Sequence, residues 1–137
     1  MIKKLFSVFI LLSAAIYITA KNLPEPFETA QPEPMTPAIR QTMIDFTAQL
    51  MACANQSKAK QFGKHCIQEK SKFKQYRHAY SVMKNMRLNV NNIDNVFTIN
   101  GSIYYVTMSD HLENSYELQL CYNSQTSSCQ VYGFEEI

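Results

Sequence analysis

Residues 102–122 read SIYYVTMSDHLENSYELQLCY, and this stretch decides the fold class. A polar connection at residues 110–114 separates two runs that have the period of two typical of β-strands. In the second run, one side of the strand carries Tyr116, Leu118, Leu120 and Tyr122, which we expect to pack in a core. The opposite side carries Glu117, Gln119 and Cys121, which we expect to face a wetter environment.

The strand pattern extends outward from this hairpin in both directions. Residues 95–100 and 128–134 complete a predicted set of four strands with residues 102–109 and 115–122. The dipeptide Asn100-Gly101 predicts a tight type I′ turn, in which both residues adopt positive φ. A hairpin that is symmetric about Gln125 would place Cys121 directly opposite Cys129.

Helical periodicity precedes the strands. Thr36-Pro37 is a good helix start, and steps of four and three then link Ile39, Met43, Phe46, Leu50 and Cys53 up to a plausible end at Asn55. A second helical region is predicted over residues 64–87. The order of two helices and then four antiparallel strands predicts an α+β fold, with an N-terminal helical hairpin on one face of a four-stranded meander.

The N-terminus has the pattern of an export signal. Lys3 and Lys4 precede an uncharged apolar run, so residues 1–20 are predicted to be a signal peptide, with an uncleaved membrane anchor as the alternative. Residues 21–36 are rich in proline and predict an extended tether. Residues 37–137 then form a single domain, and the expected location is periplasmic or secreted, with anchoring in the inner membrane if residues 1–20 remain.

The cysteines carry the second prediction about compartment. In an exported chain disulfides are the default, and local pairing would join Cys53 to Cys66 and Cys121 to Cys129. The first bridge would staple the two helices and the second would cross the last hairpin. Zinc is the rival interpretation, but no C-x-x-C spacing occurs, so we expect neither a metal nor a cofactor.

The element order of residues 36–137 resembles the nuclear-transport-factor-2-like and cystatin-like group, in which N-terminal helices pack against a curved meander. The closing segment Cys129-Gln-Val-Tyr-Gly-Phe-Glu-Glu-Ile is similar in style to the last strand of such domains, although the tryptophan often seen there is missing. The resemblance implies the fold and no functional residue, because this group includes enzymes and non-catalytic periplasmic domains alike.

Charge is divided unevenly along the chain. Residues 58–87 contain nine Lys and Arg against one Glu, whereas residues 88–137 contain six acidic residues and no Lys or Arg. This split can steer a charged partner, or the two halves can attract each other within the fold. The basic candidates for binding are Lys70, Lys74, Arg77 and Lys84, with a solvated helix face as the plainer interpretation.

Tyrosines are dense in the predicted sheet. Tyrosine is enriched at recognition surfaces because it offers a large area and a polar tip. The candidates are Tyr104, Tyr105, Tyr116, Tyr122 and Tyr132, and core packing is the alternative explanation for them.

Catalytic candidates are sparse. His65, His78 and His111 are scattered, and Asp110 and Glu113 sit with His111 in one connection, for which a solvated turn is the better explanation. We therefore assign no catalytic residue and expect a non-catalytic domain that binds another envelope or secreted protein, such as an inhibitor, an immunity-type protein or an accessory part of an envelope complex. A small-molecule or lipid binder and a hydrolase-like enzyme with a histidine base are the alternatives. Nucleic acid is not expected as a partner, and membrane contact is expected only through residues 1–20.

Overall fold

The structure is a computed structural model that describes residue 27 and residues 33–137. The predicted signal segment at residues 1–20 and most of the predicted tether lie outside the described residues. Within the described part, the helices are α2 (Pro37–Asn55), α3 (Ala59–Lys64) and α4 (Phe73–Asn85), with short 3₁₀ turns at Lys70–Lys72 and Val90–Asn92. The strands are β1 (Ile93–Thr98), β2 (Ile103–Ser109), β3 (Ser115–Asn123) and β4 (Ser128–Glu136).

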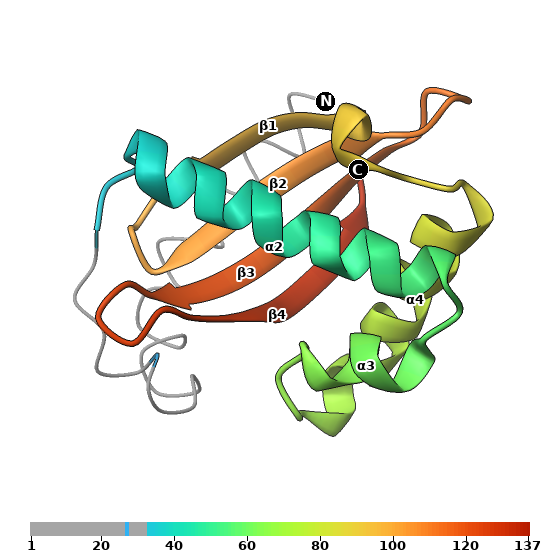
Figure 1. The fold of residues 1–137 in the computed structure, drawn as a ribbon, viewed down its shortest axis with the longest axis horizontal. Helices are drawn as coiled ribbons and strands as arrows, with labels where there is room; N and C mark the ends of the chain where they lie inside the picture. The colour runs from blue at the N-terminus through green and yellow to red at the C-terminus, as the bar shows by residue number, and fades with distance from the viewer. Residues whose placement is uncertain (1–26, 28–32) are drawn as a thin grey trace.

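The four strands form one antiparallel sheet in the order β1-β2-β3-β4 within the described part of the chain. Helix α2 lies across one face of this sheet, and α4 packs beside it over β4 (Figure 1). The predicted α+β architecture, with helices on one face of a meander, is therefore confirmed.

The main core lies between the helices and this inner face of the sheet. Its buried side chains come from α2, α4 and the alternate positions of the strands that face the helices. The face predicted from the alternation in β3 is confirmed, because Tyr116, Leu118 and Leu120 are buried in this core and Tyr122 packs against it. Burial of this face is the main favourable term that holds the sheet to the helices.

Helix α2 begins and ends where the sequence predicted. The Thr36 side chain accepts a hydrogen bond of 3.1 Å from the backbone N–H of Ile39, and Pro37 occupies the first helical position. Asn55 is the last helical residue, and its side-chain amide donates a hydrogen bond of 3.0 Å to the carbonyl of Leu88. This bond ties the end of α2 to the segment that leads into the sheet.

The second predicted helix, over residues 64–87, is interrupted in the structure. The chain leaves α3 and runs along the open edge of β4, where Cys66 pairs with Val131 in a parallel bridge. Val131 donates its backbone N–H to the carbonyl of His65 at 2.8 Å and accepts from the backbone N–H of Ile67 at 3.0 Å. Helical periodicity could not reveal this break, because it is caused by an edge strand distant in sequence that needs partners.

The turn at Asn100-Gly101 differs from the predicted type I′ geometry. Gly101 has a φ of 72°, but Asn100 is not among the residues with positive φ. Residues 99–102 form a wider connection instead, in which the Asn100 side chain accepts hydrogen bonds from the backbone N–H groups of Ser102 (2.9 Å) and Ile103 (3.0 Å). A Cβ atom at Gly101 would lie 2.7 Å from backbone atoms of Glu33, so this position requires glycine for close approach as well as for φ.

The outer face of the sheet is not the wet surface that the alternation in β3 predicted. A second buried cluster occupies it, formed by Phe27, Ile67, Ile103, Tyr105 and Cys121. Glu117 on the same face is 7% exposed. Among the residues that the structure describes, no helix has the length and apolar character needed to cross a membrane.

Candidate binding pocket

The predicted disulfides are absent, since all four cysteines lie in the described part of the chain as free thiols and no pair is at disulfide distance. The register between β3 and β4 explains why Cys121 and Cys129 do not pair. Cys121 lies opposite Gln130, and Cys129 lies opposite Tyr122, one position away from the predicted pairing. Because neighbouring residues in a strand point to opposite faces, Cys129 packs against the main core whereas Cys121 belongs to the outer cluster.

The register shift comes from the connection between β3 and β4. Residues 124–127 form a four-residue loop, in which the Asn123 side chain accepts a hydrogen bond of 2.9 Å from the backbone N–H of Gln125. Ser127 has a φ of 52°, which closes the loop. A loop with an even number of residues has its centre between two residues rather than at Gln125, and this moves Cys121 out of line with Cys129.

The two side chains of the other predicted pair, Cys53 and Cys66, lie in different environments. Cys66 is 1% exposed, and its thiol donates to the carbonyl of Phe62 at 3.5 Å. Cys53 is half-buried and lies 4.0 Å from the side-chain oxygen of Gln61. Burial raises the pKa of the Cys66 thiol to about 12, so this side chain is an uncharged wall group at neutral pH and not an activated nucleophile.

The candidate tyrosines are distributed over both faces of the sheet. Tyr104 and Tyr116 are buried in the main core, and Tyr122 packs against it. Tyr105 is buried on the outer face, where its ring stacks on Phe97 with centroids 5.2 Å apart, and Tyr132 packs against the same cluster. The five side chains therefore do not form one continuous tyrosine surface.

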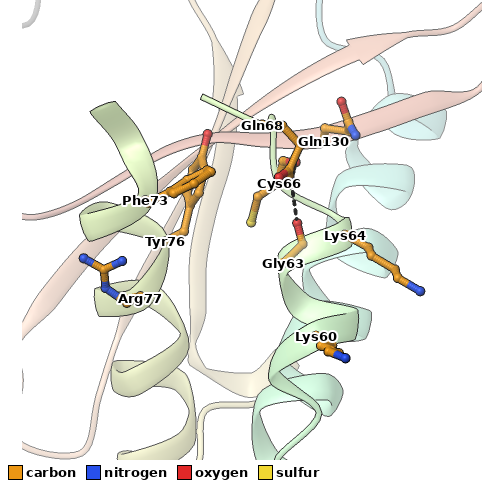
Figure 2. Close-up of a pocket in the computed structure, with 9 residues that line it drawn as sticks. All are labelled: Lys60, Gly63, Lys64, Cys66, Gln68, Phe73, Tyr76, Arg77 and Gln130. Atoms are coloured by element: carbon orange, nitrogen blue, oxygen red, sulfur yellow. Dashed lines mark hydrogen bonds between the residues drawn. The ribbon is translucent and has the colours of Figure 1, made fainter. Parts of the chain in front are cut away.

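The candidate basic residues are exposed, and one of them borders a pocket. Lys74, Arg77 and Lys84 project from α4, and Lys70 begins the 3₁₀ turn before it. Arg77 lines an open pocket of about 770 Å³ between α3 and α4. Figure 2 shows the residues that line it, which are Lys60, Gly63, Lys64, Cys66, Gln68, Phe73, Tyr76, Arg77 and Gln130.

This pocket exists because of the break in the second predicted helix. The detour of the chain along β4 separates α3 from α4, and the Cys66 sulfur points into the space between them (Figure 2). The Gln68 amide donates a hydrogen bond of 3.0 Å to the carbonyl of Gly63, which holds the detour against the end of α3. A Cβ atom at Gly63 would have no described atom outside its own helix within 4 Å, so the pocket is open above this glycine.

The walls of the pocket combine apolar surface with polar groups. Phe73 and Cys66 supply apolar surface, while Lys64 and Arg77 lie at opposite edges of the pocket and direct their charged ends away from the space between the helices (Figure 2). The buried hydroxyl of Tyr76 has no hydrogen-bond partner among the described residues. Burial, and then the nearby Cys66 and Cys121 thiols, raise the pKa of Tyr76, so its hydroxyl remains a neutral donor. An apolar group attached to an anion or to a hydrogen-bond acceptor would suit these walls.

Lys72 stabilises the strand edge next to the pocket. Its ammonium group donates a hydrogen bond of 2.7 Å to the carbonyl of Tyr132 and lies 3.1 Å from the centroid of the Tyr132 ring. Desolvation lowers the pKa of Lys72, although Glu69 and Cys121 act in the opposite direction. The cation–π contact and the hydrogen bond give this lysine a structural role at the edge of β4.

The three histidines considered as catalytic bases lie in separate surroundings in the part of the chain that the structure describes. His78 lies 4.0 Å from the Glu136 carboxylate on the surface, His65 packs edge-on against Phe46, and His111 is exposed. None of these three described residues lines the pocket between α3 and α4. Within residue 27 and residues 33–137, no three His, Cys, Asp or Glu side chains gather in a way that could hold a metal ion.

Asp110 is a structural residue of its hairpin. Its carboxylate accepts hydrogen bonds from the backbone N–H groups of Leu112 (2.8 Å) and Asn114 (3.0 Å), from the Asn114 amide (3.0 Å) and from the Tyr116 hydroxyl (2.8 Å). Desolvation alone would raise the pKa of Asp110, but these hydrogen bonds outweigh it and lower the pKa. The carboxylate therefore organises the loop from a buried position, so the solvated-turn interpretation is wrong for Asp110, although His111 and Glu113 are exposed as it predicted.

Sequence reasoning missed most of the pocket. It selected Arg77 for charge and Cys66 for a disulfide, but it did not identify Gly63, Phe73 or Tyr76 as binding residues. Gly63 was the available signal, because an isolated glycine lowers helix stability and so argues against one continuous helix over residues 64–87 and the residues just before them.

Comparison with family models, with curated proteins and with solved structures finds no match for this chain. The resemblance to the nuclear-transport-factor-2-like and cystatin-like group therefore stays a prediction from element order.

Proposed function

We propose that this chain is a non-catalytic binding domain that holds another protein through the pocket between α3 and α4. The observation that carries the proposal is an open pocket with apolar walls and three cationic side chains, Lys60, Lys64 and Arg77, among its lining. The partner that fits this chemistry offers an apolar side chain flanked by acidic residues. An inhibitor, an immunity-type protein or an accessory part of an envelope complex would each use such a contact.

The proposed location is the periplasm or the exterior of the cell. It now rests on the basic and apolar pattern of residues 1–20 alone. Because all four cysteines are free thiols, disulfides give this proposed location no further support.

A second candidate function is the binding of a small amphiphilic anion, such as a lipid. The volume of about 770 Å³ favours it, because ligand pockets are commonly about 300–1,000 Å³. The open form of the pocket and its spread cations favour a protein segment instead, since a small ligand is usually enclosed on most sides.

Gly63 offers a matched pair of variants to test both functions. Gly63→Phe fills the pocket from a position where the added side chain meets open space, while Gly63→Ala adds only a methyl group. The alanine variant should be as stable as the wild type or more stable by up to about 1 kcal/mol, because alanine is the better helix former. Both variants should fold, which is checked by circular dichroism.

The experiment compares wild type, Gly63→Ala and Gly63→Phe as baits in chemical cross-linking of envelope extracts from the source cell. We expect the first two to capture the same polypeptide and Gly63→Phe to lose it. The same three proteins are titrated with anilinonaphthalene sulfonate, an anionic aromatic probe. Probe binding that Gly63→Phe abolishes, without any captured polypeptide, would favour the small-ligand function. Equal behaviour of all three proteins in both assays would refute the pocket as the binding site.

A further inference from the structure

The hairpin between β2 and β3 presents an apolar side chain to solvent. Leu112 at its tip is 62% exposed, although exposing a leucine side chain to water is unfavourable in free energy. The hairpin projects from one end of the sheet (Figure 1). A single exposed leucine is ordinary, but this one stands at the end of a projecting loop that hydrogen bonds to Asp110 hold together.

The loop is held by the Asp110 carboxylate. That carboxylate accepts hydrogen bonds from the backbone N–H groups of Leu112 and Asn114. The backbone N–H of Glu113 donates a hydrogen bond of 3.1 Å to the carbonyl of Asp110. Glu113 has a φ of 66°, a conformation that these bonds maintain. Leu112 is thus presented by a preorganised loop, which lowers the entropic cost of inserting it into a partner.

One acidic side chain stands beside this tip. Glu113 follows Leu112 directly and is exposed. At the base of the hairpin, Ser109 donates a hydrogen bond to the Asp94 carboxylate, while the Glu136 carboxylate lies 4.0 Å from His78 on α4. The hairpin tip therefore offers an apolar side chain next to one exposed carboxylate, that of Glu113.

The pocket between α3 and α4 has the complementary chemistry. Its walls are apolar, and Lys60, Lys64 and Arg77 line it. The cations around the pocket would attract the Glu113 carboxylate beside the leucine, while the open space above Gly63 would receive the leucine itself. We propose that the partner of this pocket is a second copy of the chain, whose Leu112 hairpin inserts between α3 and α4. This inference rests on the proposed binding function of the pocket and names its occupant.

The two surfaces are different parts of the molecule, so the contact is head-to-tail. A pair of copies joined in this way keeps one free hairpin at one end and one free pocket at the other. Such heterologous contacts form closed rings or open chains rather than a two-fold dimer. Association should weaken as salt is added, because exposed charges at the rim are screened.

The test uses one variant for each side of the contact. Leu112→Ser removes the apolar side chain at an exposed position, and Gly63→Phe blocks the pocket, with Gly63→Ala as the matched control. Sedimentation velocity of the full chain should show concentration-dependent assembly for the wild type and for Gly63→Ala. Each of the other two variants alone should associate roughly ten- to a hundredfold more weakly, the range expected for losing one buried leucine contact.

Mixing supplies the decisive result. Leu112→Ser retains a working pocket and Gly63→Phe retains a working hairpin, so their mixture should form a one-to-one complex and nothing larger. A wild type that stays monomeric at every concentration, or a mixture that sediments as the two separate proteins, would overturn the proposal. In that case retained binding of anilinonaphthalene sulfonate by Leu112→Ser, together with its loss in Gly63→Phe, would show that the pocket still binds a different partner.

Discussion

Glu117 should make the stability of this domain fall as the pH rises through neutrality. The residue lies in β3 opposite Glu135 in β4, on the outer face of the sheet, and it is 7% exposed. Burial, and then the proximity of Glu135, raise the pKa of Glu117 to about 7, against an opposing hydrogen bond with Gln119. The folded protein therefore prefers this carboxyl group in its protonated form.

The sign and size of the effect follow from linkage. A carboxyl group whose pKa is raised in the folded state contributes to the free energy of unfolding. This contribution is fully present below pH 4.5, the ordinary pKa of the group, and is lost as the pH rises through about 7. One pKa unit corresponds to about 1.4 kcal/mol, so the full difference would be about 3 kcal/mol. Partial solvent screening reduces this figure, and we expect a loss of about 2 kcal/mol.

Urea unfolding followed by circular dichroism measures this loss. Wild type and Glu117→Gln should have similar free energies of unfolding near pH 4.5, whereas at about pH 8 the variant should be the more stable by about 2 kcal/mol. Glu135→Gln is the control, since it relieves only the repulsion and should recover a smaller part. An equal loss between the two pH values in wild type and Glu117→Gln would refute a raised pKa at Glu117.

Three further predictions concern the pocket, the hairpin and the thiols. Tyr76→Phe should leave the free energy of unfolding unchanged or raise it by about 1 kcal/mol in chemical denaturation, because the lost hydroxyl has no partner among the described residues; a loss of more than about 2 kcal/mol would reveal a hidden hydrogen bond. Asp110→Asn should speed amide hydrogen exchange at Leu112 and Asn114, whose N–H groups donate to its carboxylate, while exchange in α2 stays unchanged; unaltered exchange at both amides would contradict the role given to Asp110. Peptide mapping of the native protein after alkylation should find no peptide that joins Cys121 to Cys129, because these side chains lie on opposite faces of the sheet; recovery of that joined peptide would contradict the observed register.

Local sequence signals predicted the elements that depend on local physics. The Thr36-Pro37 start of α2 and the alternation in β3 needed only a cap, a missing backbone donor and a period of two. These features act within a few residues, so the sequence displays them directly.

Features that depend on distant partners could not be predicted in the same way. The break after α3 arises because Val131 of β4 requires backbone partners, and helical periodicity contains no record of that strand. The pocket is a consequence of this break, so its apolar wall residue Phe73 looked like ordinary helix core. A shift of one residue in a loop was enough to remove the disulfide expected at Cys121, since register errors of one position exchange the two faces of a sheet.

The most direct test of the account is a map of where an anionic apolar probe binds. Anilinonaphthalene sulfonate is titrated into isotope-labelled protein, and backbone amide shifts are followed by NMR. We expect the largest shifts at Gly63, Cys66, Tyr76 and Gln130, around the pocket between α3 and α4. Shifts centred on another surface, with these four amides unmoved, would contradict the claim that this pocket is the binding site.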